Sequence, residues 1–119
     1  MKQKGFIKVN ADDVPVYEPS GHKNTYNRRL AGLFNGSENI EFIIGEMHSG
    51  GGAERHVHSN VDQMMYVMDG TLRIISPGGE EIAAPGDLVV FIKGEEHEVQ
   101  CESEFARFIV LYSPPRDKT

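Results

Sequence analysis

The chain has 119 residues, of which 39% are hydrophobic and 25% charged, and it carries a formal charge of −6. This length suits one domain with a modest core, and the acidic balance disfavours nucleic-acid or polybasic membrane binding. No apolar run approaches the roughly 20 residues of a membrane-spanning helix, and the first residues lack the apolar stretch of a signal peptide. A single cysteine, Cys101, excludes an internal disulfide. We therefore expect a cytoplasmic protein with no membrane or nucleic-acid partner.

Short segments of alternating apolar and polar side chains run along the sequence, separated by 13 Gly and 6 Pro. Apolar residues keep helical spacing nowhere for long, so the pattern predicts an all-β sandwich or barrel. The predicted strands cover residues 6–9, 28–34, 40–48, 62–68, 71–76, 80–84, 87–92, 98–101 and 105–112.

Three glycine-containing turns punctuate these strands. Asp69-Gly70 predicts a two-residue hairpin, because such turns need positive φ at both central residues. Residues 77–79 and 85–87 predict two more turns. We expect one domain over residues 1–119, with a barrel core at about 28–112, an N-terminal arm at 1–27 that is irregular from 11 to 26, and a frayed tail at 113–119.

Histidines provide the clearest chemical signal. His56 and His58 are two residues apart, so on an extended chain their side chains share one face. Gln63 begins a predicted strand, and His97 lies at the entry to a later one. Two imidazoles on one face, with donors from other strands, suit a transition metal at the mouth of a barrel. Taken alone, the His-x-His pair fits surface or core histidines equally well.

The spacing Gly50-x5-His56-x-His58-x4-Gln63-x6-Gly70 resembles the first motif of the cupins, G-x5-H-x-H-x3,4-E-x6-G. Gly86, Gly94 and His97 match part of the second motif, and 15 residues separate Gly70 from Gly86, as in small bacterial cupins. The resemblance covers residues 40 to 112. It implies a double-stranded β-helix, the cupin jelly-roll barrel, and one divalent transition metal held by His56, His58, Gln63 and His97. It also implies a homodimer.

Three positions depart from the family pattern. Gln63 stands where the family usually has Glu, Ile92 where it has Pro, and Cys101 where it has Asn. The first departure replaces an anionic ligand with a neutral one. The segment His-x-His-x4-Gln-x2-Tyr-Val is similar to that of pectin-degradation cupins, which open unsaturated uronate sugars. The alternative is a cupin that has lost its metal.

Alternation along the strands predicts the pocket residues. If Gln63 points inward, Met65 does so too. Arg28, Arg73 and Arg107 are candidates to bind a substrate carboxylate, although each also fits a solvated surface charge. Glu46 is the candidate proton donor or base.

These residues predict a metal-dependent enzyme acting on a small molecule, using Fe, Mn, Ni, Zn or Cu. Because all four ligands are neutral, the metal keeps its full charge, which favours oxygen-independent isomerase or lyase chemistry on a carboxylate or sugar acid. Two alternatives stay open: a cupin dioxygenase, and a metabolite-binding or sensor protein without catalysis.

Overall fold

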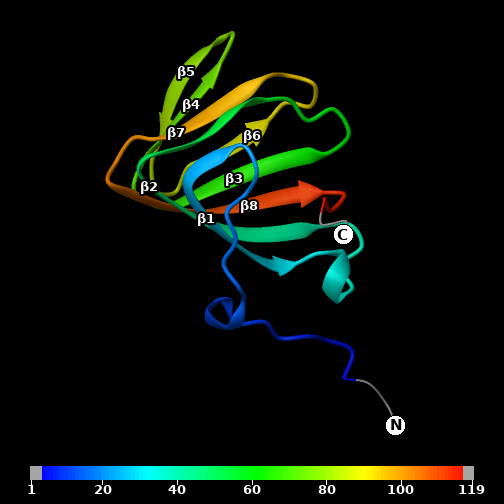
Figure 1. Cartoon of the computed structure of the whole chain (residues 1–119). Helices are drawn as coiled ribbons and strands as arrows, with labels where there is room; N and C mark the ends of the chain where they lie inside the picture. The colour runs from blue at the N-terminus through cyan, green and yellow to red at the C-terminus, as the bar shows by residue number, and fades with distance from the viewer. Residues whose placement is uncertain (1–3, 117–119) are drawn as a thin grey trace.

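The computed structural model describes residues 4–116. Eight antiparallel strands form a nearly closed barrel, and two 3-10 helices, Ala11–Asp13 and Leu33–Asn35, lie outside it (Figure 1). The strands are β1 (His22–Ala31), β2 (Glu41–His56), β3 (Asp62–Asp69), β4 (Leu72–Ser76), β5 (Gly79–Ala83), β6 (Leu88–Phe91), β7 (His97–Cys101) and β8 (Phe105–Ser113). Among residues 4–116, no helix is long and apolar enough to cross a membrane. The predicted all-β jelly-roll barrel is confirmed.

Strand β2 joins the two halves of the barrel. Its first half pairs with β8, and its second half pairs with β7, where His56 lies opposite His97. Along the sheet the hydrogen-bonded order is β5-β4-β7-β2-β8-β3-β6, and β1 pairs with β2 beside this path. The pairing of β2 with β7 therefore brings together two histidines that are far apart in the sequence.

Glycines let β2 bend between its two partners. The sequence predicted a strand ending at residue 48, whereas β2 continues to His56. A Cβ at Gly51 would lie 2.7 Å from the carbonyl oxygen of His48, and a Cβ at Gly52 would lie 2.6 Å from that of Val99. Only glycine fits at these two positions, so β2 can lie close to the backbones of β1 and β7 there.

The predicted hairpin at Asp69-Gly70 is wrong. Gly70 does adopt a positive φ of +71°, but β3 pairs with β6 and β8, while β4 pairs with β5 and β7. The chain crosses between the two halves of the barrel at this point, and a Cβ on Gly70 would collide with the carbonyl oxygen of Phe105. The turn at residues 77–79 does form a hairpin, with Ser76 opposite Gly79.

The N-terminal region departs furthest from the prediction. Residues 6–9 form no strand, and Phe6 and Ile7 remain 70% and 67% exposed. By contrast, β1 begins at His22, inside the predicted arm, because its residues pair with β2. The strand predicted at 28–34 ends at Ala31, where the Asn35 side chain binds the Leu30 carbonyl and the Gly32 amide and forms a turn.

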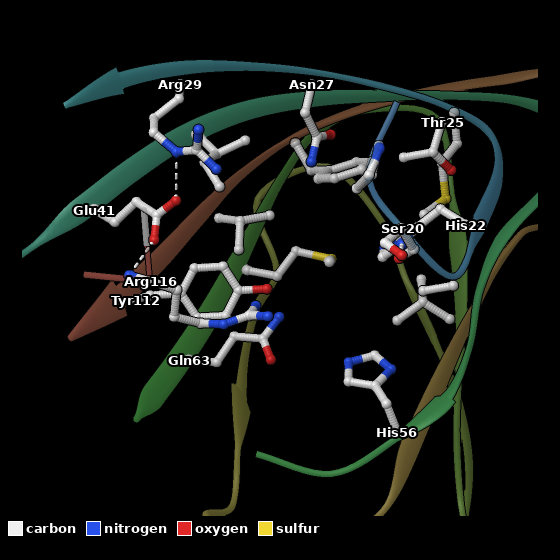
Figure 2. Close-up of a pocket in the computed structure, with 18 of the residues that line it drawn as sticks. Ser20, His22, Thr25, Asn27, Arg29, Glu41, His56, Gln63, Tyr112 and Arg116 are labelled. Carbon is white, nitrogen blue, oxygen red and sulfur yellow. Dashed lines mark hydrogen bonds and ion pairs between the residues drawn. The ribbon is translucent and has the colours of Figure 1, made fainter. Parts of the chain in front are cut away.

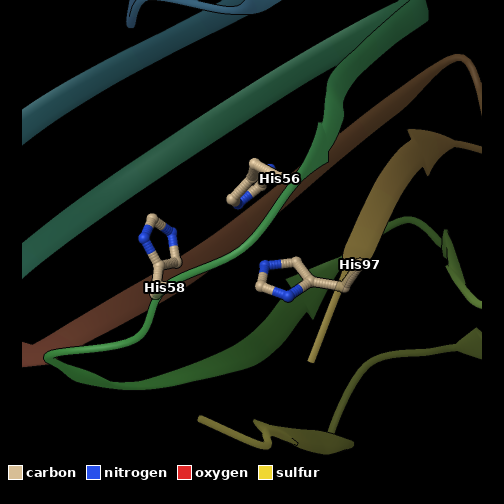
Figure 3. A group of neighbouring side chains, drawn as sticks. All are labelled: His56, His58 and His97. Carbon is tan, nitrogen blue, oxygen red and sulfur yellow. The ribbon is translucent and has the colours of Figure 1, made fainter. Parts of the chain in front are cut away.

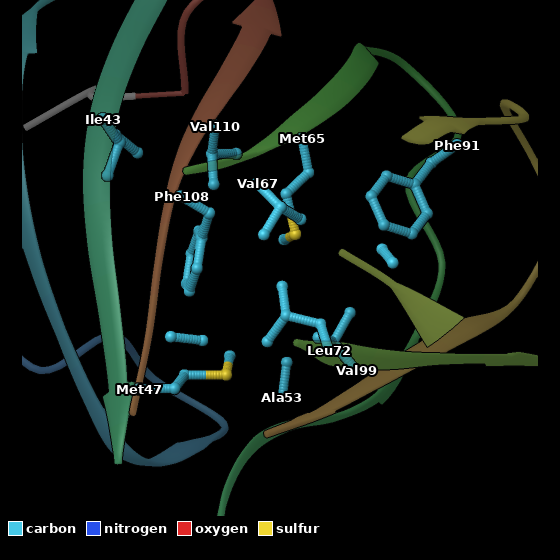
Figure 4. Close-up of a cluster of buried hydrophobic side chains, with 12 residues drawn as sticks. Ile43, Met47, Ala53, Met65, Val67, Leu72, Phe91, Val99, Phe108 and Val110 are labelled. Atoms are coloured by element: carbon cyan, nitrogen blue, oxygen red, sulfur yellow. The ribbon is translucent and has the colours of Figure 1, made fainter. Parts of the chain in front are cut away.

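The apolar core lies inside the barrel, where side chains from several strands meet (Figure 4). Alternate residues of each strand point inward, as the two-residue period requires. In β3, Gln63, Met65 and Val67 are buried, as predicted from alternation. The buried apolar side chains are Ile43, Met47, Ala53, Met65, Val67, Leu72, Ala83, Phe91, Val99, Ala106, Phe108 and Val110.

Candidate metal centre and its pocket

Three histidines from two strands and a loop converge at one end of the barrel (Figure 3). His56 ends β2, His58 follows two residues later, and His97 begins β7. Their ring centroids are 4.7 Å apart for His56 and His58, 4.3 Å for His56 and His97, and 5.7 Å for His58 and His97. One ligand nitrogen from each ring lies within 4.8 Å of the others. The structure therefore assembles the predicted triad.

Each imidazole of the triad has a ring nitrogen that is available to bind a metal. Nδ1 of His56 lies 2.6 Å from the carbonyl oxygen of Glu54. Because a carbonyl only accepts, Nδ1 is the donor of this hydrogen bond, which leaves Nε2 as the ring nitrogen that can bind a metal. Nε2 of His58 and Nε2 of His97 are buried and have no hydrogen-bond partner among the described residues.

Gln63 completes the set from β3. Its side chain is buried, 6% exposed, and its Oε1 has no hydrogen-bond partner among residues 4–116. It lines the same cavity as His56 and His97. Three orphaned buried atoms in one small region are unusual, since such groups are normally hydrogen-bonded. Imidazole nitrogens and an amide oxygen suit a divalent transition metal, so the residues present fit the metal that the sequence predicted.

Burial also keeps two of the imidazoles neutral. Desolvation lowers the pKa of His58 to about 4, and the nearby Arg116 guanidinium adds to this effect. Desolvation lowers the pKa of His97 to about 4 as well, with a further contribution from His56. At neutral pH these nitrogens are unprotonated, which is the form that binds a metal.

A cavity of about 270 Å³ extends from His56 and His97 into the barrel. This is slightly below the range of drug-sized ligand sites, so it suits a small metabolite. Met65 lines it, in agreement with the predicted alternation. Ile43, Val99 and Phe108 also form apolar wall. Apart from Gln63 on β3 and His97 on β7, the polar lining comes from β1, β2, β8 and the segments that flank them.

Four of the predicted pocket residues lie elsewhere. Glu46 and Arg107 are register partners on β2 and β8, with their charged atoms 3.7 Å apart. They face outward because their neighbours Met47 and Phe108 are buried inside. Arg28 also lies outside the cavity lining, since its neighbours Asn27 and Arg29 take the inward positions. Arg73 is bound to Glu80 and Glu102 on the surface. Contrary to the prediction, none of these four residues lines the cavity.

Arg29 and Glu41, which the sequence interpretation missed, form the polar wall of the cavity (Figure 2). Glu41 is 1% exposed, and its Oε2 accepts a 2.7 Å hydrogen bond from Nε of Arg29. Arg29 also donates to the hydroxyl of Tyr17 at 3.2 Å. Alternation would have identified Arg29 if the strand had been predicted to begin at residue 22, because Thr25, Asn27 and Arg29 share the inward face.

The segment after β8 also contributes to the site. The backbone N–H of Arg116 donates to Oε1 of Glu41 at 2.6 Å, and its guanidinium lies 4.6 Å from the Tyr112 ring centroid. Figure 2 shows this guanidinium reaching over Tyr112 toward Gln63. Arg116 lines the cavity rather than forming part of a frayed tail; residues 117–119 lie outside the described part of the chain.

Two further groups at the cavity can hold protons. Burial raises the pKa of the Tyr112 hydroxyl, which stays protonated at neutral pH. His22, which the sequence placed in an irregular arm, lines the cavity 6.5 Å from the His56 ring, and desolvation lowers its pKa. By contrast, His48 is exposed on the outer face, against Tyr26 and Phe105.

An antiparallel barrel with a histidine cluster at the mouth of a small cavity defines the class of protein. Residues 43–112 match the Cupin domain family, and the chain belongs to this family. No curated protein matches it. The cupin fold agrees with a protein that binds small molecules.

Solved structures agree on the fold. The polyketide cyclase RemF from Streptomyces resistomycificus is similar, with a TM-score of 0.82, 24% identity, and coverage of 95% of this chain and 82% of that one. KdgF from Halomonas sp. has a TM-score of 0.79 and 19% identity over 92% of this chain and 94% of that one. A sugar phosphate isomerase of the cupin superfamily from Silicibacter pomeroyi has a TM-score of 0.77 and 22% identity, covering 90% of this chain and 75% of that one.

Proposed function

We propose that this cupin is a metal-dependent enzyme that binds one divalent transition metal through His56, His58, Gln63 and His97. The observation that carries the proposal is the convergence of unpartnered buried atoms: Nε2 of His58, Nε2 of His97 and Oε1 of Gln63. The metal is Fe, Mn, Ni, Zn or Cu, because imidazole and amide ligands accept all of these.

The reaction that this ligand set favours is oxygen-independent isomerase or lyase chemistry on a small carboxylate or sugar acid. With four neutral ligands, the bound metal would supply Lewis-acid polarisation of a carbonyl and stabilise an enolate. An anionic protein ligand would stabilise a higher oxidation state, and Gln63 removes the one that the family usually has. Cupin dioxygenase chemistry is the alternative outcome.

Residues that line the cavity are candidates to bind the substrate. Arg116 carries a positive charge at the cavity, and no described carboxylate forms an ion pair with its guanidinium. It is therefore suited to bind a substrate carboxylate, the role that the sequence suggests for Arg28, Arg73 and Arg107. The protonated Tyr112 hydroxyl replaces Glu46 as the candidate proton donor. Met65 packs against the apolar part of the substrate.

Two proteins with a similar fold are named a polyketide cyclase and a sugar phosphate isomerase, and these names add no evidence on the reaction beyond the ligand set of this chain. At 24% and 22% identity these structures themselves share only the fold with this chain.

Metal analysis and an activity screen test the proposal. As-purified protein from metal-supplemented medium should hold close to one equivalent of a first-row metal. Unsaturated uronates and related keto acids, screened under strict anaerobiosis, should be turned over, whereas flavonols, diketones and thiols in air should not. Oxygen consumption in step with product would favour a dioxygenase. Tight metal binding without any turnover would favour a metabolite-binding or sensor protein.

The same chain is proposed to be cytoplasmic and to form a homodimer. Apolar side chains on the outer face of β3 and β6 support the dimer, since Tyr66, Leu88 and Val90 are 43%, 54% and 52% exposed. Sedimentation analysis should give twice the chain mass, and Val90→Lys should shift the distribution toward monomer. A wild-type monomer at micromolar concentration would contradict the dimer.

A further inference from the structure

The inward face of β1 is polar where a barrel interior is normally apolar. Thr25, Asn27 and Arg29 alternate along this face and line the cavity. The hydroxyl of Thr25 donates to the carbonyl of Lys23 at 2.8 Å, and Arg29 is bound to Glu41. Of the three, Asn27 is the residue whose side chain retains an unsatisfied atom.

Asn27 is held rigidly. Its backbone N–H and C=O both bond to Tyr17, at 2.8 and 2.9 Å, and its side chain is 8% exposed. Opposite it on β2 is Gly45, where a Cβ would come within 2.8 Å of Oδ1 of Asn27. The missing side chain at Gly45 therefore leaves room for the amide, which Figure 2 shows directed from β1 toward the cavity.

Oδ1 of Asn27 has no hydrogen-bond partner among the described residues. A buried acceptor without a donor destabilises the protein unless something supplies that donor. The Tyr17 hydroxyl accepts from Arg29 and keeps an O–H to donate, but among residues 4–116 it makes no hydrogen bond to Oδ1 of Asn27. Polar groups retained without partners in a ligand cavity are typical of positions that recognise a ligand.

The charges around the cavity indicate which donor fits. Arg29 and Arg116 are cationic, and the carboxylate of Glu41 is already bound to Arg29 and to the backbone of Arg116. These cations would repel a substrate ammonium group, whereas they would not repel a neutral hydroxyl. A hydroxyl also both donates and accepts, so it satisfies the Asn27 amide in either orientation of its oxygen and nitrogen.

We propose that Asn27 is a specificity residue that binds a hydroxyl group of the substrate, remote from the carboxylate end. This rests on the carboxylate-binding metal pocket of the proposed function and narrows its substrate class to hydroxy acids, of which sugar acids are examples. A site built to hydrogen-bond a hydroxyl discriminates strongly against the analogue that lacks it, because the amide is then left unpaired.

Matched acids test this inference on the zinc-loaded protein. Calorimetry compares propanoate, butanoate and pentanoate with their 3-hydroxy, 4-hydroxy and 5-hydroxy counterparts, so that the hydroxyl is presented at three distances. At one chain length or more, the hydroxy acid should bind the wild type roughly tenfold more tightly, the factor that one unmade buried hydrogen bond represents. Asn27→Leu should abolish this preference while retaining zinc stoichiometry.

Thr25→Val is the matched control, because it removes a buried hydroxyl from the same face that is already bonded to Lys23. It should keep the preference. A further readout separates recognition from a structural role: without ligand, Asn27→Leu should melt no lower than the wild type, since it removes an unpaired acceptor.

The possible results distinguish an error in the role of Asn27 from an error in the proposed carboxylate pocket. If both members of every pair bind the wild type equally, the role of Asn27 is overturned and the carboxylate pocket stands. If no acid binds, with or without zinc, the proposed carboxylate pocket falls and this inference falls with it. If the preference survives in Asn27→Leu, another residue binds the hydroxyl and the assignment is wrong.

Discussion

Loss of His97 should abolish the thermal stabilisation that a metal confers. Metal bound only to the folded state, at 100 times its dissociation constant, stabilises a protein by about 2.7 kcal/mol. The entropy of unfolding is about 2.1 cal/mol/K per residue, or about 0.25 kcal/mol/K for the 119 residues of this chain. The wild type should therefore gain about 11 °C in Tm on saturation with metal.

His97→Ala removes one of the four proposed ligands. If the metal dissociation constant rises 100-fold or more, the same metal concentration stabilises by at most about 0.4 kcal/mol, or roughly 2 °C in Tm. His48→Ala is the matched control, because His48 is exposed and packs on the outer face against Tyr26 and Phe105. Its metal-induced gain should equal that of the wild type.

Differential scanning fluorimetry with and without zinc or nickel measures these shifts. The comparison uses the metal-induced change within each variant, so any effect of the substitution on the metal-free protein cancels. Equal metal-induced gains in His97→Ala and the wild type would refute the assignment of His97 as a ligand. Loss of the gain in His48→Ala would show that the fourth ligand lies on the outer face.

Three further predictions concern stability. The pKa values of His58 and His97 are about 4 in the folded state and near 6.5 in the unfolded state, so the unfolded chain binds more protons between these pH values. The metal-free protein should therefore lose stability as the pH falls from about 6.5 to 4. A Tm that does not change over this pH range would contradict the burial of these two imidazoles. Glu41→Gln weakens the buried ion pair with Arg29 and should lower the free energy of unfolding by about 2 kcal/mol, which corresponds to about 8 °C in Tm. Glu46→Gln affects an outward-facing pair whose charged atoms are 3.7 Å apart, so it should change Tm by less than about 2 °C. Equal decreases in Tm for the two variants would contradict this difference in burial. Gly45→Ala places a Cβ 2.8 Å from Cζ of the buried Phe108 ring and should lower the free energy of unfolding by about 1–3 kcal/mol. In Gly78→Ala the new Cβ would have Ser76 within 4 Å, at 3.8 Å, so the urea midpoint should not change. A Gly45→Ala variant as stable as the wild type would mean that the paired strands can move apart to accommodate the methyl group.

Alternation and turn residues were sufficient to predict six of the strands, β3 to β8, to within one or two residues. The two-residue period is a local property, so Gln63, Met65 and Val67 could be placed inward from the sequence alone. The histidine triad was also predictable, because its spacing resembles a family motif and the structure brings the three rings together.

What the sequence could not determine depends on pairing between distant segments. Gly70 has the positive φ of a hairpin, yet the partners of β3 and β4 are other strands, and only their packing fixes this crossing. The inward face of β1 depends on its register with β2, which puts Arg29 rather than Arg28 at the cavity. Arg116 belongs to the site because Glu41, 75 residues earlier, binds its backbone. The local pattern of residues therefore determined strands β3 to β8 and the histidine triad, while the cavity's charged wall was decided by tertiary contacts that no local period encodes.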